Sequence, residues 1–255
     1  ITAMWALGFV LGPALGAIVA APGRNPALAP SLVAASATLI SMLSVLLWRG
    51  IDPPATDAEG PGGAGSAAGT PTWLFGLTGL LALVQTGLVA ITGFFVTDLL
   101  GWSAKNISFL MLGIAMTIVV VQIAGIPRLV KRLGERGGLA SGLVLGILGC
   151  LTITLAPKAP GVMVGAPLLF ASITVGQTSI MTLLSRSTAF DRQGAVMGRA
   201  NAIQAGGRII GPIAFGALYA SVAPTAPYTI TALLMSGGLL FCGLMMLRLR
   251  GAPGP

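Results

Sequence analysis

The stretch MGRANAIQAGGRIIGPIAFGALYA, residues 197–220, is an apolar run with one charged residue, Arg208, deep inside it. If Arg199 marks the water boundary, Arg208 lies about 13 Å further along a helix, near the middle of a hydrocarbon core roughly 30 Å thick. A charge at that depth is costly, so a partner or a wet cavity is expected. Asn201 and Gln204 precede Arg208 at steps of three and four residues, on the same helical face. The pattern predicts a transmembrane helix whose polar seam lines a water-filled or substrate-filled interior.

The composition of the chain indicates a polytopic membrane protein. Hydrophobic residues make up 55% of the 255 residues and charged residues only 8%, a balance that soluble domains of this length do not show. The net charge of +8 does not indicate a nucleic-acid partner, because the basic residues sit at the ends of apolar runs. There is no histidine, and Cys150 and Cys242 each fall inside an apolar run. We therefore expect no metal site, no cofactor and no disulfide framework.

Eight apolar runs of about 20 residues predict an all-α membrane protein, a bundle of eight transmembrane helices. They lie at residues 1–21, 30–48, 73–97, 107–126, 139–156, 161–184, 200–220 and 227–247. The segment 51–72 is rich in Gly, Ala and Pro and predicts a flexible linker. The chain thus divides into two helices at 1–50, the linker, and six helices at 73–255. Because it opens inside an apolar run without an initiator methionine, we interpret it as a fragment of a longer protein.

The basic residues of the loops predict the orientation. If the first span runs outward, the cytoplasmic side carries Arg49, Arg128, Lys131, Arg132, Arg136, Arg186, Arg192, Arg199, Arg248 and Arg250. The outer side then carries only Arg24, Lys105 and Lys158. This bias places both ends of the segment, and the linker, in the cytoplasm, and the cell membrane is the expected location.

Other polar residues within the spans extend the candidate cavity. Three glutamines lie inside apolar runs: Gln85, Gln122 and Gln177. Three threonines form a stripe four residues apart: Thr174, Thr178 and Thr182. Threonines can also bond back to their own helix, and Arg208 can serve the fold by bonding to backbone carbonyls, so structural roles remain open for both. No carboxylate lies in the middle of any span, so a proton-carrying acid would have to come from elsewhere.

Two glycine-rich segments predict close packing of helices. One contains Gly8, Gly12, Pro13 and Gly16, and the other contains Gly211, Pro212 and Gly216. Glycines four apart let neighbouring backbones approach, and a proline bends its helix. Ordinary packing would suffice to explain either segment. However, GPALGAIVA at 12–20 is echoed by GPIAFGALYA at 211–220, which is typical of transporters built from repeated bundles.

These motifs resemble the major facilitator superfamily, in particular its drug/proton antiporter branch. The segment GFVLGPALGA at 8–17 resembles the antiporter signature of the fifth helix, and residues 193–219 resemble the loop and eleventh helix of the branch. PRLVKRLGER at 127–136 is similar to the second copy of the cytoplasmic loop motif, which Arg132, Gly134 and Arg136 fit. Pro127 and Lys131 depart from that motif, so its gating role is not carried over.

The resemblance implies helices five to twelve of a twelve-helix fold, with residues 1–50 as the last two helices of the N-terminal bundle. It implies secondary transport of a small solute by alternating access, as drug or metabolite efflux coupled to protons. The partners would be the solute, protons, membrane lipids and the first four helices of the same chain. A membrane enzyme is not expected, because no span offers a catalytic pair of acids or a histidine. A non-transporting scaffold or receptor of the same fold remains an alternative.

Overall fold

The computed structural model describes residues 28–47 and 72–250 of the chain. Outside the described residues lie the predicted first span, nearly all of the predicted linker, and the packing residues Gly8, Gly12, Pro13 and Gly16.

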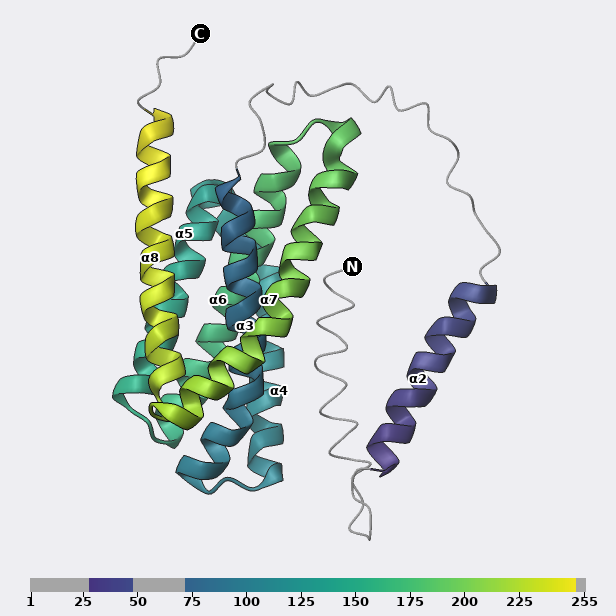
Figure 1. The fold of residues 1–255 in the computed structure, drawn as a ribbon, viewed down its shortest axis with the longest axis vertical. Coiled ribbons are helices and arrows are strands. Elements are labelled where there is room, and N and C mark those ends of the chain that lie inside the picture. The colour runs from purple at the N-terminus through teal and green to yellow at the C-terminus, as the bar shows by residue number, and fades with distance from the viewer. Residues whose placement is uncertain (1–27, 48–71, 251–255) are drawn as a thin grey trace.

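The described residues form helices and no strands. The α-helices are α2 (Leu28–Leu47), α3 (Trp73–Leu100), α4 (Ala104–Val120), α5 (Ile126–Leu155), α6 (Ala159–Arg186), α7 (Gln193–Ser221) and α8 (Ala226–Arg250). A π-helical turn, η1 (Val121–Gly125), joins α4 to α5, and a short 3-10 turn, η2 (Phe190–Arg192), precedes α7. α2 stands apart from the other helices in Figure 1, and its described side chains are exposed. The all-α prediction therefore holds throughout the described ranges.

Four helical stretches are long and apolar enough to cross a membrane: Trp73–Leu100, Lys105–Leu155, Ala159–Arg186 and Ala226–Met245. The second of these has 51 residues, far more than the ~20 that one crossing needs. Gly134 interrupts it with φ 69° and ψ 179°, a backbone conformation that is essentially restricted to glycine. α7 is not among the four stretches, since Gln204 and Arg208 reduce its hydropathy. These four stretches agree with the polytopic membrane protein that the composition predicted.

The predicted loop between the fourth and fifth spans contains the one backbone break of the helical stretch from α4 to α5. Those spans were expected to end at residue 126 and begin again at 139, but the helix continues through η1 into α5 with its only break at Gly134. Lys131 and Arg132 are exposed and belong to residue types that favour helix. A count of apolar residues finds only the membrane part of such a helix, so the predicted spans stop where its polar part begins.

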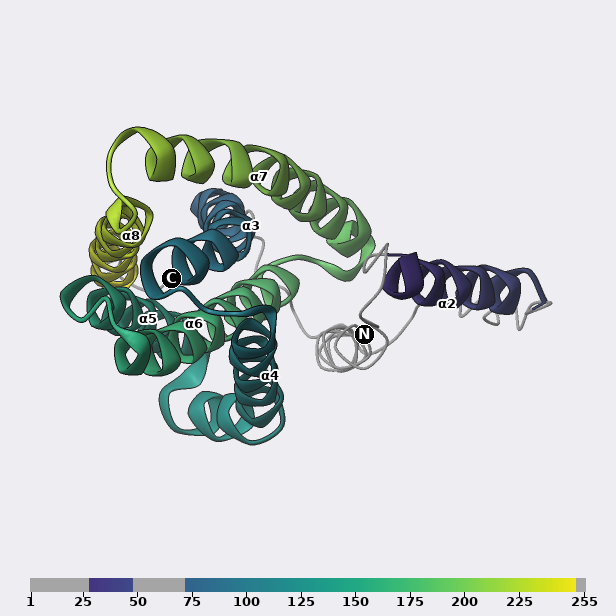
Figure 2. The same ribbon diagram turned by 90° about the horizontal axis from the view of Figure 1, so that it is seen from below.

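Two close helix pairs build the bundle. At α5 and α6, a Cβ added to Gly149 would lie 2.8 Å from the carbonyl oxygen of Gly165. At α3 and α7, a Cβ added to Gly207 would lie 2.6 Å from the carbonyl oxygen of Gly79, and one added to Gly211 would meet the carbonyl oxygen of Leu83. Only glycine allows these backbone approaches. Seen from below, α3 lies between α7 and α6, and α5 packs on α6 and α8 (Figure 2).

Aromatic side chains fix α8 against this arrangement. Tyr228 of α8 is 1% exposed, and its ring lies 5.0 Å from that of Phe95 on α3, edge to face at 65°. Its hydroxyl group lies 3.3 Å from Oγ1 of Thr92, so the polar end of the tyrosine is satisfied inside the bundle. Phe215 of α7 is also buried and packs against Gly87 of α3. The core therefore joins α3, α7 and α8 and leaves the other face of α7 free for polar residues.

Candidate functional site

A polar pocket of about 690 Å³ opens among α3, α4, η1, α6 and α7. All six residues predicted to face a cavity line it: Gln85, Gln122, Gln177, Asn201, Gln204 and Arg208. The other lining residues are Ile118, Thr174, Thr178, Met181, Thr182, Ser185 and Met197. The volume lies within the range of about 300–1,000 Å³ that is typical of small-molecule sites. Residues far apart in the chain thus meet at one site. The largest separation, 123 positions, is that between Gln85 and Arg208.

The polar seam of α7 forms one wall of the pocket. Arg208 donates from Nη2 to Oε1 of Gln204 at 3.1 Å, one helical turn away. Gln204 is only 7% exposed, whereas Asn201 and Arg208 are exposed. The buried amide therefore holds one end of the guanidinium group, and the remaining N–H groups of Arg208 are free to face the pocket.

Three more amides come from the other walls. Nε2 of Gln177 on α6 donates to Oε1 of Gln85 on α3 at 3.0 Å. Gln122 lies in the π-helical turn η1, and such turns inside α-helices are frequent at functional sites. The turn changes the register of the helix at the point where its glutamine joins the pocket.

The threonine stripe proves to bond within its own helix. Oγ1 of Thr174 donates to the carbonyl oxygen of Phe170 at 3.0 Å, and Oγ1 of Thr182 donates to that of Thr178 at 2.9 Å. The hydroxyl protons of Thr174 and Thr182 are therefore used within α6, and these two hydroxyl groups can only accept hydrogen bonds from the pocket. Of the two roles considered for these threonines, the structural one accounts for their hydrogen bonds.

The apolar lining was not predicted from the sequence. Ile118, Met181 and Met197 line the pocket beside the amides. An apolar residue within an apolar run carries no signal that separates a cavity wall from a lipid-facing surface. Only the spatial arrangement of the helices could identify these three.

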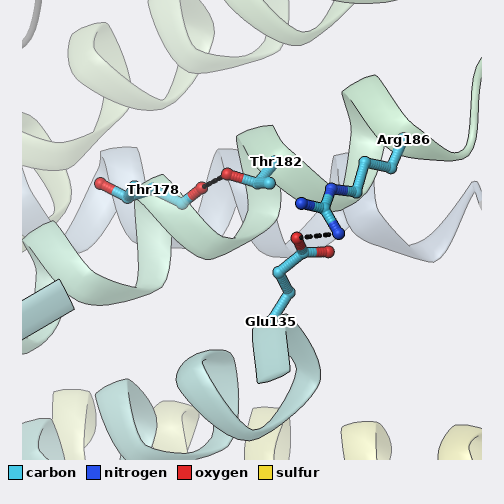
Figure 3. Close-up of polar contacts among 4 residues, drawn as sticks. All are labelled: Glu135, Thr178, Thr182 and Arg186. Atoms are coloured by element: carbon cyan, nitrogen blue, oxygen red, sulfur yellow. Dashed lines mark hydrogen bonds and ion pairs between the residues drawn. The ribbon is translucent and has the colours of Figure 1, made fainter. Parts of the chain in front are cut away.

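None of the acidic residues that the structure describes lines the pocket. Asp98, at the end of α3, accepts a hydrogen bond of 2.9 Å from the hydroxyl group of Tyr219. Glu135 of α5 pairs with Arg186 at the end of α6, with 2.8 Å between Oε1 and Nη1. Figure 3 shows this pair one helical turn beyond Thr182. The pocket walls therefore carry one formal charge, that of Arg208.

The residues of the cytoplasmic loop motif lie on either side of Glu135 in the sequence. Arg132 and Arg136 are exposed, and Gly134 provides the backbone break of α5. Glu135, which the sequence analysis did not single out, has a side chain only 10% exposed, against 73% for that of Arg186. The signal that could have identified it is its position as the one acid in a run of basic residues.

The glycines of the α7 packing motif behave differently from one another. Gly211 is buried against α3, and Pro212 lies next to it within the helix. A Cβ added to Gly216 would meet no heavy atom of the described residues within 4 Å. Gly207, which the motif did not include, also approaches the backbone of α3 closely.

Comparison with known proteins identifies a family that has this kind of helical fold. The sequence model of the Major Facilitator Superfamily matches residues 1–212. The chain belongs to this superfamily. As a major facilitator protein it is an integral membrane protein of a family of transporters, which confirms the prediction that it is not an enzyme.

Individual relatives of this major facilitator chain are distant. It is 24% identical over 178 residues to the MFS-type transporter avaJ of Aspergillus versicolor. This alignment covers 62% of this chain and 34% of that protein. It is 26% identical over 238 residues to the class C tetracycline resistance protein of Escherichia coli. This alignment covers 88% of this chain and 58% of that protein. The chain thus spans between a third and three fifths of these relatives.

A solved structure confirms the fold. The crystal structure of the human organic anion transporter MFSD10 (TETRAN) superimposes with a TM-score of 0.61 at 20% sequence identity. The alignment covers 94% of this chain and 61% of the human chain. At this identity the likeness shows the all-α polytopic fold alone.

Proposed function

We propose that the protein is a secondary active transporter that carries a small amphipathic solute by alternating access, and that the pocket among α3, α4, η1, α6 and α7 binds this solute. The observation that supports the proposal most is the convergence of six polar side chains from four helical elements on one pocket inside an apolar bundle. Polar groups are costly at membrane depth and are retained there for solute or ion pathways. A scaffold would need no such cavity.

Alternating access requires a second bundle opposite the pocket. In this proposal residues 73–255 are the C-terminal bundle, residues 1–50 are the last two helices of the N-terminal bundle, and 51–72 is a cytoplasmic linker. The first four helices would belong to the same chain, since the relatives it matches are longer. Both ends of the present segment would be cytoplasmic, and the membrane would be the cell membrane.

Efflux coupled to protons completes the proposal. The guanidinium of Arg208 offers N–H donors and no acceptor, so we assign it the role of a fixed positive charge and not that of a proton carrier. No described residue that lines the pocket is a carboxylic acid. The proton-carrying acid would therefore lie on the first four helices, across the pocket from Arg208.

Solute counterflow tests the transport proposal without assuming a coupling ion. The intact protein, reconstituted in liposomes preloaded with an amphipathic dye, should exchange labelled dye across the membrane faster than protein-free liposomes. Gln204→Leu should slow this exchange, because it removes the support of Arg208. Ile213→Leu is the matched control, because Ile213 lies on α7 outside the pocket and is 70% exposed.

Coupling is measured in the same liposomes with a pH-sensitive dye inside. An imposed pH gradient should drive solute accumulation, and adding solute should move protons in the opposite direction. If folded protein exchanges no member of a panel of anionic, neutral and cationic amphipathic dyes, the scaffold alternative is the better account. Exchange that ignores the pH gradient would remove proton coupling and leave transport in place.

A further inference from the structure

We propose that the solute carries an anionic group, such as a carboxylate, sulfonate or phosphate, and that this group binds the guanidinium of Arg208. The inference rests on the proposed function, because it names the substrate class of the same pocket. Its starting point is the charge of the site. Thirteen residues line the pocket, and Arg208 is the one charged residue among them.

Within residues 72–250, no acidic side chain is recorded in contact with Arg208. The sequence contains six acidic residues. Asp98 lies near the end of α3, Glu135 beside the Gly134 break of α5, and Asp191 in the turn before α7. Asp98 bonds to Tyr219, Glu135 pairs with Arg186, and Asp191 pairs with Arg192. The other three fall in the predicted linker: Asp52, Asp57 and Glu59. Tyr219, the partner of Asp98, lies eleven residues, or about 16 Å of helix, beyond Arg208.

Arg208 is instead held by a neutral group. Its contact with Gln204 uses one N–H group, and Gln204 is nearly buried while Arg208 is exposed to the pocket. A guanidinium has five N–H donors in a planar fork that fits carboxylate, sulfonate and phosphate oxygens in pairs. A cation supported from behind by an amide, with its free edge toward an opening, is arranged to receive an anion.

The other walls describe the rest of the solute. The amides of Gln85 and Gln177 bond to each other, so they offer a neutral polar surface. Met181, Met197 and Ile118 supply apolar wall, and methionine side chains adapt to varied shapes. A pocket of about 690 Å³ with this lining fits an organic anion with an apolar body better than an inorganic ion.

Isosteric probes separate charge from shape. The intact protein in detergent micelles would be titrated by calorimetry with 2-naphthoate, 2-naphthamide and 2-naphthamidine, which are negative, neutral and positive planar analogues. Because a charge-assisted hydrogen bond contributes about 1.5–3 kcal/mol, 2-naphthoate should bind about tenfold or more tightly than the amide. The amidine should bind most weakly. Arg208→Gln should reduce the ratio between carboxylate and amide to near one, and Arg208→Lys should retain part of it because the charge remains.

The controls keep the result independent of folding. Unchanged binding of 2-naphthamide by Arg208→Gln would show that the pocket is intact in that variant. Arg128→Gln removes another exposed charge, one outside the pocket, and should leave the preference unchanged. Equal affinity for the carboxylate and the amide, tightest binding of the amidine, or binding of none of the three would overturn the inference. Exchange of neutral or cationic dyes by the same protein in liposomes would then still support the transport proposal, so the two failures are distinguishable.

Discussion

Gln85 of α3 and Gln177 of α6, 92 positions apart in the chain, join their amide side chains across the pocket, with 3.0 Å between Nε2 of Gln177 and Oε1 of Gln85. Both side chains are half-buried, and each amide is the hydrogen-bond partner of the other. The bond ties α3 to α6 at the level of the proposed site. Pocket shape and helix packing are therefore linked through one contact.

Replacing one of these glutamines should cost more than replacing both. Gln85→Leu or Gln177→Leu leaves the other amide without its partner, which should lower the free energy of unfolding by about 1–3 kcal/mol. The double variant has no unpaired amide, so a double-mutant cycle should show coupling of about 1 kcal/mol. Reversible unfolding in SDS measures the stability of all three variants. The rate of dye counterflow should fall in all three variants. The pocket loses polar surface even in the double variant, whose stability partly recovers.

The close contact of α3 and α7 should not tolerate a methyl group at Gly207. Its added Cβ would meet two backbone atoms, the oxygen of Gly79 at 2.6 Å and the nitrogen of Leu83 at 3.0 Å, which cannot move aside as a flexible side chain can. Gly207→Ala should therefore destabilise the bundle by about 1–3 kcal/mol. Gly216→Ala on the same helix meets open space and should be neutral or slightly stabilising. Equal thermal unfolding of the two variants would show that α7 does not pack on α3 in this way.

The break in α5 should depend on glycine at position 134. Its φ of 69° with ψ of 179° is a conformation that other residues reach only with strain of about 1–3 kcal/mol. Gly134→Ala should lower the thermal stability of the intact protein by a corresponding amount. Gly113→Ala, at a helical glycine of α4 with open space around it, is the control and should not lower stability. If both variants unfold at the wild-type temperature, the chain does not turn at Gly134.

The ion pair between Glu135 and Arg186 should matter more than that between Asp191 and Arg192. Glu135 is nearly buried and lies 2.8 Å from Arg186, whereas the second pair is 3.8 Å apart with both side chains largely exposed. Because Arg186 is itself exposed to water, we expect Arg186→Gln to cost about 1 kcal/mol or less, but measurably more than Arg192→Gln. The double variant Glu135→Gln with Arg186→Gln should recover part of the loss in an SDS unfolding titration. Indistinguishable stabilities of the two single arginine variants would contradict this ranking.

The sequence alone was informative where a polar residue interrupts an apolar run. Asn201, Gln204 and Arg208 were placed on one helical face by their spacing, and the three glutamines of other spans were grouped with them because amides are costly in lipid. Each of these signals is local to one helix. The meeting of the helices at one pocket appears only in the folded arrangement.

Other features gave no local signal. The contact of Gly207 with Gly79 needs the register of α7 against α3, which a sequence pattern of small residues does not fix. The continuation of helix past residue 126 was hidden because exposed Lys131 and Arg132 look like loop residues in a search for apolar runs. The burial of Glu135 depends on Arg186, which lies 51 positions further along the chain. Long-range register, rather than composition, decides all three.

Water access along α7 tests the central claim most directly. In a background without Cys150 and Cys242, single cysteines would be introduced as Asn201→Cys, Arg208→Cys, Ile209→Cys and Ile213→Cys, and their reaction with a membrane-impermeant thiol reagent would be timed. All four native side chains are exposed on the surface of the bundle, but only Asn201 and Arg208 line the pocket. The account predicts rapid labelling at 201 and 208 and protection of 209 and 213 by lipid. Equal rates at all four positions, or protection of 201 and 208, would contradict a water-accessible solute pocket at this face.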